Sequence, residues 1–131
     1  MGVNFYLLDT HVLLWWLFDD VQLSIRARDA IIDPNSRVFV SSVCGWEISI
    51  KHHLGKLPHV GRIMKELPLY VRRERFEILP ISLEHALAAG ALDGKHKDPF
   101  DRMLIAQACN EELTLISNDK VFKQYKVSVL W

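Results

Sequence analysis

The sequence predicts an α/β fold with a mostly parallel central sheet of about five strands, covered by helices on both faces. Short apolar runs rich in β-branched and aromatic residues alternate along the chain with longer segments whose apolar residues recur at helical spacing. The length of 131 residues suits one domain, residues 1–131. Half of the residues are hydrophobic, which is enough material for a core without disulfide bonds.

Five apolar segments are predicted strands. The first, VNFYLLD at residues 3–9, is apolar until its final aspartate, as in a strand that is buried on both faces. The other four are RVFVS, RFEILPI, LTLISND and VSVLW, at residues 37–41, 75–81, 113–119 and 127–131. The first and the fourth end in polar residues, and ligand sites of parallel sheets form at the carboxyl ends of strands.

The segments between the strands are predicted helices. Four precede the third strand, at residues 10–19, 23–33, 42–57 and 62–73; the third ends near Gly55 and the fourth is interrupted by Pro68. A helix over residues 82–92 starts at Ser82 with an approximate capping box. A long helix follows residue 98, and KVFKQY at residues 120–125 forms a short one.

The segment HKDPFDRMLIAQA, residues 96–108, places two aspartates at the start of an apolar helix. Proline favours the first helical position, where its missing N–H has no cost, so Asp98 is the predicted N-cap and Asp101 the third helical residue. The reciprocal role at that third position favours Glu or Gln. Asp101 is therefore free to point toward the ends of the strands.

Three further carboxylates have notable positions: Asp9 and Asp119 follow strands, and Glu47 lies within an otherwise apolar helix. Each has a structural alternative. Asp9, or Thr10 in its place, caps the next helix; Asp119 caps the short helix or shapes a turn; Glu47 faces solvent. Converging carboxylates repel each other and are tolerated around a hard cation such as Mg²⁺ or Mn²⁺, whose bound water is a hydrolytic nucleophile. With Asp101, the set indicates metal-dependent hydrolysis of a phosphate ester.

The stretches LLDTHVLLWWL, WEISIKHHLGKL, DPFDRMLIAQA and LISND, which span residues 7–119 in this order, resemble the PIN-domain family and, within it, the VapC-type toxins of prokaryotic toxin–antitoxin modules. The resemblance implies a three-layer α/β/α fold, Mg²⁺- or Mn²⁺-dependent endoribonuclease activity, frequent homodimerisation and inhibition by a cognate antitoxin. It gives the catalytic and metal-binding roles to Asp9, Glu47, Asp101 and Asp119. The small polar residue that precedes the last acid in the family falls on Ser117 or Asn118.

The formal net charge is zero, but the charges are segregated. Residues 51–75 carry seven basic and two acidic residues, or +5, whereas residues 1–35 carry two basic and five acidic residues, or −3. The basic segment is either a rim that contacts RNA phosphates or a solvated helix face. Candidate contacts to substrate are Lys51, Arg102, Ser117 and Asn118; Arg102 has a structural ion pair as its alternative.

The two cysteines, Cys44 and Cys109, form no C-x-x-C motif and are predicted to be reduced, buried thiols of a cytoplasmic protein. The apolar run near the N-terminus is broken by Asp9 and His11 and is too short to span a bilayer, so we expect no membrane segment. The six histidines lack zinc-site spacing. His11 is predicted to be a packed or capping residue, with contact to the site beside Asp9 as its alternative.

Trp15, Trp16 and Trp46, together with leucines of the first helix, exceed what one helix face usually buries. Burial in the core is the default interpretation. Contact with a second subunit or with the antitoxin is the alternative, since aromatic residues are enriched in interfaces.

The leading hypothesis for function is a cytoplasmic endoribonuclease toxin that uses metal-activated water. The alternative is a catalytically silent PIN-like module that only binds RNA or a protein; the presence of all four acids argues against it. A D-x-D phosphatase needs a second aspartate two residues after the first, where this chain has His11. Motifs of the forms G-x-G-x-x-G and G-x-x-x-x-G-K-[ST] do not occur, so nucleotide-cofactor chemistry has no support.

Overall fold

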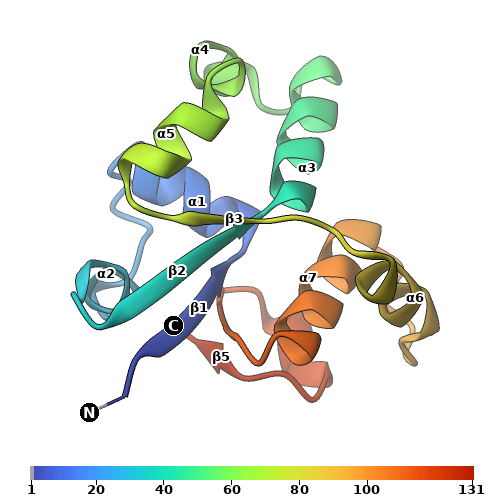
Figure 1. The fold of residues 1–131 in the computed structure, drawn as a ribbon. Helices are drawn as coiled ribbons and strands as arrows, with labels where there is room; N and C mark the ends of the chain where they lie inside the picture. Colours follow the sequence, from blue (N-terminus) through green and yellow to red (C-terminus); the bar gives the residue numbers. More distant parts are fainter. Residues whose placement is uncertain (1) are drawn as a thin grey trace.

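Five parallel strands form one sheet in the computed structural model, which describes residues 2–131 (Figure 1). The strands are β1 (Asn4–Leu8), β2 (Ser36–Ser41), β3 (Glu77–Leu79), β4 (Thr114–Ile116) and β5 (Val129–Leu130). Their order across the sheet is β3-β2-β1-β4-β5, and each neighbouring pair is parallel. The predicted fold class is confirmed. The strands β3, β4 and β5 are shorter than predicted.

The connecting segments are helical, as predicted. They are α1 (Thr10–Leu17), α2 (Ile25–Ile32), α3 (Ser42–His53), η1 (Pro58–Val60), α4 (Gly61–Met64), α5 (Leu67–Arg73), α6 (Leu83–Ala91), α7 (Pro99–Asn110) and η2 (Lys120–Gln124). The predicted helix over residues 62–73 is two helices. Its break precedes Pro68, which lies in the first turn of α5, where proline is tolerated. Within residues 2–131, none of the helices is long and apolar enough to cross a membrane.

The capping box at Ser82 is complete. The Ser82 hydroxyl accepts the backbone N–H of His85, and the His85 ring accepts the backbone N–H of Ser82. Histidine thus replaces the usual Glu or Gln at the third helical position, so the start of α6 is fixed more firmly than the sequence pattern indicates.

The strand order divides the helices into two layers. The chain passes from β1 to β2 to β3 in one direction and then crosses back to place β4 beside β1. Because parallel crossovers are right-handed, α1 to α5 lie on one face of the sheet and α6 and α7 on the other; Figure 1 shows α1, α4 and α5 above the sheet and α6 and α7 below and to its right. The direction reverses between β1 and β4, the point where parallel sheets bind ligands.

The middle of the core lies around the neighbouring strands β1 and β4. Aliphatic side chains of β1, β4, α1, α3 and α7 are almost fully buried; they include Leu7, Leu8, Leu13, Ile48, Leu104, Ile105, Leu115 and Ile116. Trp15 and Trp16 are half-buried and pack against this core, as predicted. Trp46 instead is 55% exposed and lies edge-on against Phe100.

The cysteines are both free, but they differ in burial. Cys44 is buried, whereas Cys109 is exposed near the carboxyl end of α7, so the prediction of burial is wrong for Cys109. Cys109 lies on the side of α7 that faces the loop before β5, where its thiol is 3.4 Å from the carbonyl oxygen of Lys126.

Candidate active site

Asp9 lies at the carboxyl end of β1 and is the N-cap of α1. Its Oδ1 accepts the backbone N–H of Val12 at 2.9 Å, so the cap is Asp9 and not Thr10. Its own N–H donates to the carbonyl of Ile116, which extends the pairing of β1 with β4 by one residue. Burial raises the pKa of Asp9, and the hydrogen bonds from Ser117 and Val12 offset only part of this effect. The fold therefore holds the Asp9 carboxylate in place although its burial costs solvation free energy.

Ser117 connects the ends of β1 and β4. Its hydroxyl donates to Oδ2 of Asp9 at 2.5 Å and accepts the backbone N–H of Asp119 at 3.0 Å. The side chain of Asp119 accepts the N–H of Val121 and is the N-cap of η2, at an exposed position. Of the two candidates for the small polar residue, Ser117 faces Asp9 and Asn118 is exposed.

Glu47 is buried in the middle of α3, with 5% of its surface exposed, so the solvent-facing alternative is wrong. Its Oε1 accepts the hydroxyl of Thr10 at 2.5 Å, which ties α3 to the residue after Asp9. Its Oε2 is 2.5 Å from the ammonium of Lys51, one helical turn later. Burial alone lowers the pKa of Lys51, but the charges of Glu47, Asp98 and Asp101 raise it above the ordinary value.

Asp98 and Asp101 divide their roles as the sequence predicts. Asp98 is the N-cap of α7 and accepts the backbone N–H groups of Phe100 and Asp101. Asp101 is the third helical residue, and its Oδ2 is 2.8 Å from Nε2 of His96. Burial raises the pKa of Asp101 to about 6; the charges of Asp98 and Glu47 add to this rise and His96 opposes it.

The side chain of Arg102, the next residue of α7, hydrogen-bonds to the protein backbone. Its guanidinium donates to the carbonyl oxygens of Ala89, Gly90, Leu92 and His96. These contacts hold the end of α6 and the loop that follows, in place of the carboxylate partner expected for a structural ion pair. Contact between Arg102 and a substrate stays a prediction.

The acidic residues approach each other to different degrees. The charge of Glu47 raises the pKa of both Asp9 and Asp101, so these three lie close enough to interact. Asp119 is linked to the same point through the hydroxyl of Ser117, by its backbone only. Within residues 2–131, no three His, Cys, Asp or Glu side chains are arranged to hold a metal ion as they stand.

In kind, these residues fit a hard divalent cation. Carboxylate oxygens are the donors that Mg²⁺ and Mn²⁺ favour, and the charge of Glu47 adds to the raised pKa of both Asp9 and Asp101, so negative charge is concentrated here. The ammonium of Lys51 balances part of this negative charge, at Glu47. A cation at this edge of the sheet would relieve the remaining excess of negative charge.

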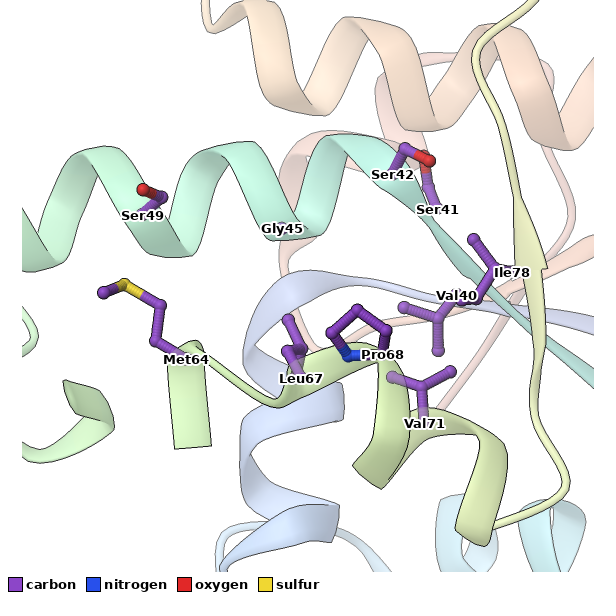
Figure 2. A pocket seen from close by; sticks show the side chains of 10 residues that line it. All are labelled: Val40, Ser41, Ser42, Gly45, Ser49, Met64, Leu67, Pro68, Val71 and Ile78. Atoms are coloured by element: carbon purple, nitrogen blue, oxygen red, sulfur yellow. The ribbon is translucent and has the colours of Figure 1, made fainter. Parts of the chain in front are cut away.

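The apolar cavity between α3 and α5 is separate from the acidic residues. It measures about 320 Å³, and Figure 2 shows Met64, Leu67, Pro68 and Val71 across from α3, with the sheet side chains Val40 and Ile78 closing it. The α3 residues that line it are Ser42, Gly45 and Ser49. At 3.6 residues per turn, these share one face of α3, and Glu47 lies on the opposite face.

Sequence reasoning missed Thr10 and His96 as neighbours of the acidic residues. Thr10 was considered only as a helix cap, although its position beside Asp9 is a signal. His96 was one of six histidines without metal-site spacing, and its distance of five residues from Asp101 is a weak signal. His11 is exposed, with its ring centroid 6.0 Å from that of Trp15, and it lowers the pKa of Asp9, so it lies near the acidic residues as the alternative states.

Comparison with known proteins agrees with the fold. The PIN domain model matches residues 6–127. No curated protein matches this chain in sequence. Similar solved structures are VapBC2 from Rickettsia felis bound to a DNA fragment from its promoter (18% identity, TM-score 0.70, covering 96% of this chain and 97% of that one) and FitAcB from Neisseria gonorrhoeae (20%, 0.59, 96% and 96%). A third is VapBC-1 from nontypeable Haemophilus influenzae, with 18% identity, a TM-score of 0.59 and 96% coverage of both chains.

Proposed function

The chain belongs to the PIN-domain family, and from this premise we propose that it is a Mg²⁺- or Mn²⁺-dependent endoribonuclease that acts as the toxin of a toxin–antitoxin module. The observation that carries the proposal is the pair of hydrogen bonds from Ser117 to Asp9 and from Thr10 to Glu47, which gathers acids from separate elements at the switch point between β1 and β4.

Four acids would hold the metal: Asp9, Glu47, Asp101 and Asp119. When bound, the metal supplies a water of lowered pKa as the nucleophile and stabilises the charge that develops on the phosphate. The protein orients the acids beforehand, Asp9 through Val12 and Ser117 and Glu47 through Thr10. This preorganisation limits the rearrangement that remains for the reaction.

Lys51 is the cation that we propose to contact a phosphate of the substrate. It lies beside Glu47 and within the field of Asp98 and Asp101, and it is partly exposed. A metal ion that binds Glu47 would compete with the ammonium of Lys51. The displaced ammonium would then be free to pair with a phosphate of the substrate. Further exposed basic residues available to RNA lie on α4, at its carboxyl end and on α5; they include Arg62, Lys65, Arg72 and Arg73.

The similar structures support a proposal about partners. VapBC-5 from Mycobacterium tuberculosis is described as a member of the VapBC family of toxin–antitoxin systems, and VapBC2 and VapBC-1 carry the same VapBC name. We propose that this chain likewise pairs with a cognate antitoxin, forms a homodimer, and acts as one catalytic domain in the cytoplasm. RNA is the proposed substrate class.

The test is cleavage of a mixed RNA pool by the purified, antitoxin-free chain with Mg²⁺, with Mn²⁺ and with EDTA. We expect metal-dependent cleavage that Asp101→Asn abolishes. Asp98→Ala is the matched control, three residues away in the same helical turn. It removes a cap worth about 1 kcal/mol of stability and should keep most of the activity.

Two results would contradict the proposal. Equal loss of cleavage in both variants would mean that Asp101 has no special role. A folded wild-type chain that binds RNA but cuts none with either metal would favour the silent binding module, which the absence of a three-ligand arrangement within residues 2–131 keeps as the second candidate.

A further inference from the structure

We infer that His96 is a positioning residue of the acidic site, whose ring fixes the Asp101 carboxylate so that its second oxygen faces the metal ion. The inference rests on the proposed metal dependence. It assigns a role to a histidine outside the four acids, in the loop that joins α6 to α7.

The ring of His96 makes a direct contact with Asp101. Nε2 lies 2.8 Å from Oδ2, and both side chains are largely buried, with exposed fractions of 26% and 20%. Within residues 2–131, the His96 ring is the one group that hydrogen-bonds to the Asp101 carboxylate, and it does so at Oδ2. Oδ1 is therefore the oxygen left for a cation. Without the ring, repulsion from Asp98 and Glu47 would favour rotation of the carboxylate away from the site.

The backbone of His96 is held as well. Nη1 of Arg102 donates to the carbonyl of His96 at 3.1 Å. Because Asp101 and Arg102 are consecutive in α7, this helix contacts His96 at its ring and at its carbonyl. The position of the ring therefore depends on the backbone and not on a side-chain torsion alone.

Arg102 also connects the loop to α6. Its remaining hydrogen bonds go to Ala89, Gly90 and Leu92, at the end of α6, where helix carbonyls lack partners of their own. The guanidinium thus joins the end of one helix, the loop and the start of the next. A lysine could not reach these carbonyls together, because its ammonium lacks the planar fork.

Gly94 limits the loop from the other side. Its φ of +117° is a conformation that favours glycine, and a Cβ at this position would lie 3.0 Å from the hydroxyl of Tyr125. The loop therefore packs closely on Tyr125, two residues before His96. Contacts with Tyr125 and with Arg102 leave the loop little room to move away from Asp101.

A histidine that donates a hydrogen bond to a metal-binding carboxylate orients that carboxylate. Removal of such an outer partner typically reduces metal affinity or activity by roughly 10–100-fold. We therefore expect the effect of His96 to appear in metal affinity itself, before any cleavage.

The experiment is a Mn²⁺ titration of the full chain, read by the electron paramagnetic resonance of free Mn²⁺. We expect His96→Ala to weaken binding by roughly 10–100-fold. His96→Gln, whose amide places a donor near the position of Nε2, should recover part of the loss. His53→Ala is the matched control: His53 is exposed, bonds only to the backbone of its own helix, and should bind Mn²⁺ like the wild type.

A double variant tests how Arg102 acts. If Arg102 contributes by holding His96, Arg102→Lys weakens Mn²⁺ binding, and adding His96→Ala to it gives no more loss than His96→Ala alone. Thermal melting of each variant without metal separates this effect from a general loss of folded protein.

The outcomes separate this inference from the proposed function. Unchanged Mn²⁺ affinity in His96→Ala, with RNA cleavage by the wild type, would overturn the role of His96 and leave the nuclease intact. Weakened affinity in a chain that cuts no RNA would support His96 and overturn the nuclease. A wild type that binds no Mn²⁺ would overturn both.

Discussion

The Asp9 side and the Asp101 side of the acidic site are held by different kinds of groups. Asp9 accepts hydrogen bonds from uncharged donors, the N–H of Val12 and the hydroxyl of Ser117, at the junction of the two central strands. Glu47 and Asp101 contact Lys51 and His96, side chains that carry or can carry positive charge. A metal ion can replace a cationic partner more readily than a backbone N–H. The donors to Asp9 are thus permanent, His96 keeps its bond to Asp101, and Lys51 is the contact that metal binding exchanges.

The largest effect on stability is expected at Asp101. Its pKa is about 6 instead of 3.8, so between about pH 4 and pH 6 the native state holds more protons than the unfolded state, and stability falls as pH rises through this window. Asparagine does not ionise, so Asp101→Asn should be more stable than the wild type above pH 6, by at most about 3 kcal/mol. The difference should shrink toward zero near pH 4.

Chemical denaturation without metal, from pH 4 to pH 8, measures this difference. Asp29→Asn, at an exposed position of α2, is the control and should follow the wild type. Added Mg²⁺ should stabilise the wild type and not Asp101→Asn. A constant difference across the pH range would show that the carboxylate of Asp101 is not strained in the metal-free protein.

The second prediction tests the donors that hold Asp9. Ser117→Ala removes the donor to buried Asp9 and the acceptor for the N–H of Asp119. Loss of a hydrogen bond to a buried charge should lower the free energy of unfolding by about 2 kcal/mol. Ser128→Ala, at an exposed serine, should change it by less than about 0.5 kcal/mol. Equal effects in urea denaturation would mean that Ser117 does not support Asp9.

The smallest effect is expected at Lys51, the exchangeable contact. The Lys51 side chain is 28% exposed, so water can replace the ammonium, and Lys51→Met should cost only about 1 kcal/mol without metal. Mg²⁺ should then stabilise the variant more than the wild type, because it has no ammonium to displace. Lys56→Met, at an exposed site beyond α3, is the control for lost charge. Equal Mg²⁺-induced shifts of Tm in Lys51→Met and the wild type would contradict the exchange.

The fold could be predicted from the sequence because its signals are local. Apolar runs of strand length, helical spacing between them and the turn residues each reflect a preference of a few neighbouring residues. Asp98 and Asp101 were separated on the same ground, since proline at the first helical position determines which aspartate is the cap. The lengths of β3, β4 and β5 were not predicted, because they depend on pairing across the sheet, which no local pattern records.

The partners that come from distant parts of the chain could not be predicted from local patterns. Thr10 meets Glu47 across 37 residues, and Arg102 meets Ala89 across 13, through backbone carbonyls that have no sequence signature. His96 lies nearer to Asp101, but nothing in its spacing separates a ring that contacts a carboxylate from one that faces water. Long-range packing decides these contacts.

The contact between Ser117 and Asp9 also concerns how the protein is made. It joins residues 108 positions apart, and β4 completes the centre of the sheet only when it inserts between β1 and β5. While residue 117 is still inside the exit tunnel of the ribosome, the side of β1 that pairs with β4 has no partner. Such a nascent chain cannot hold Asp9 in place, so the acidic site is completed only after residues 114–119 have left the ribosome.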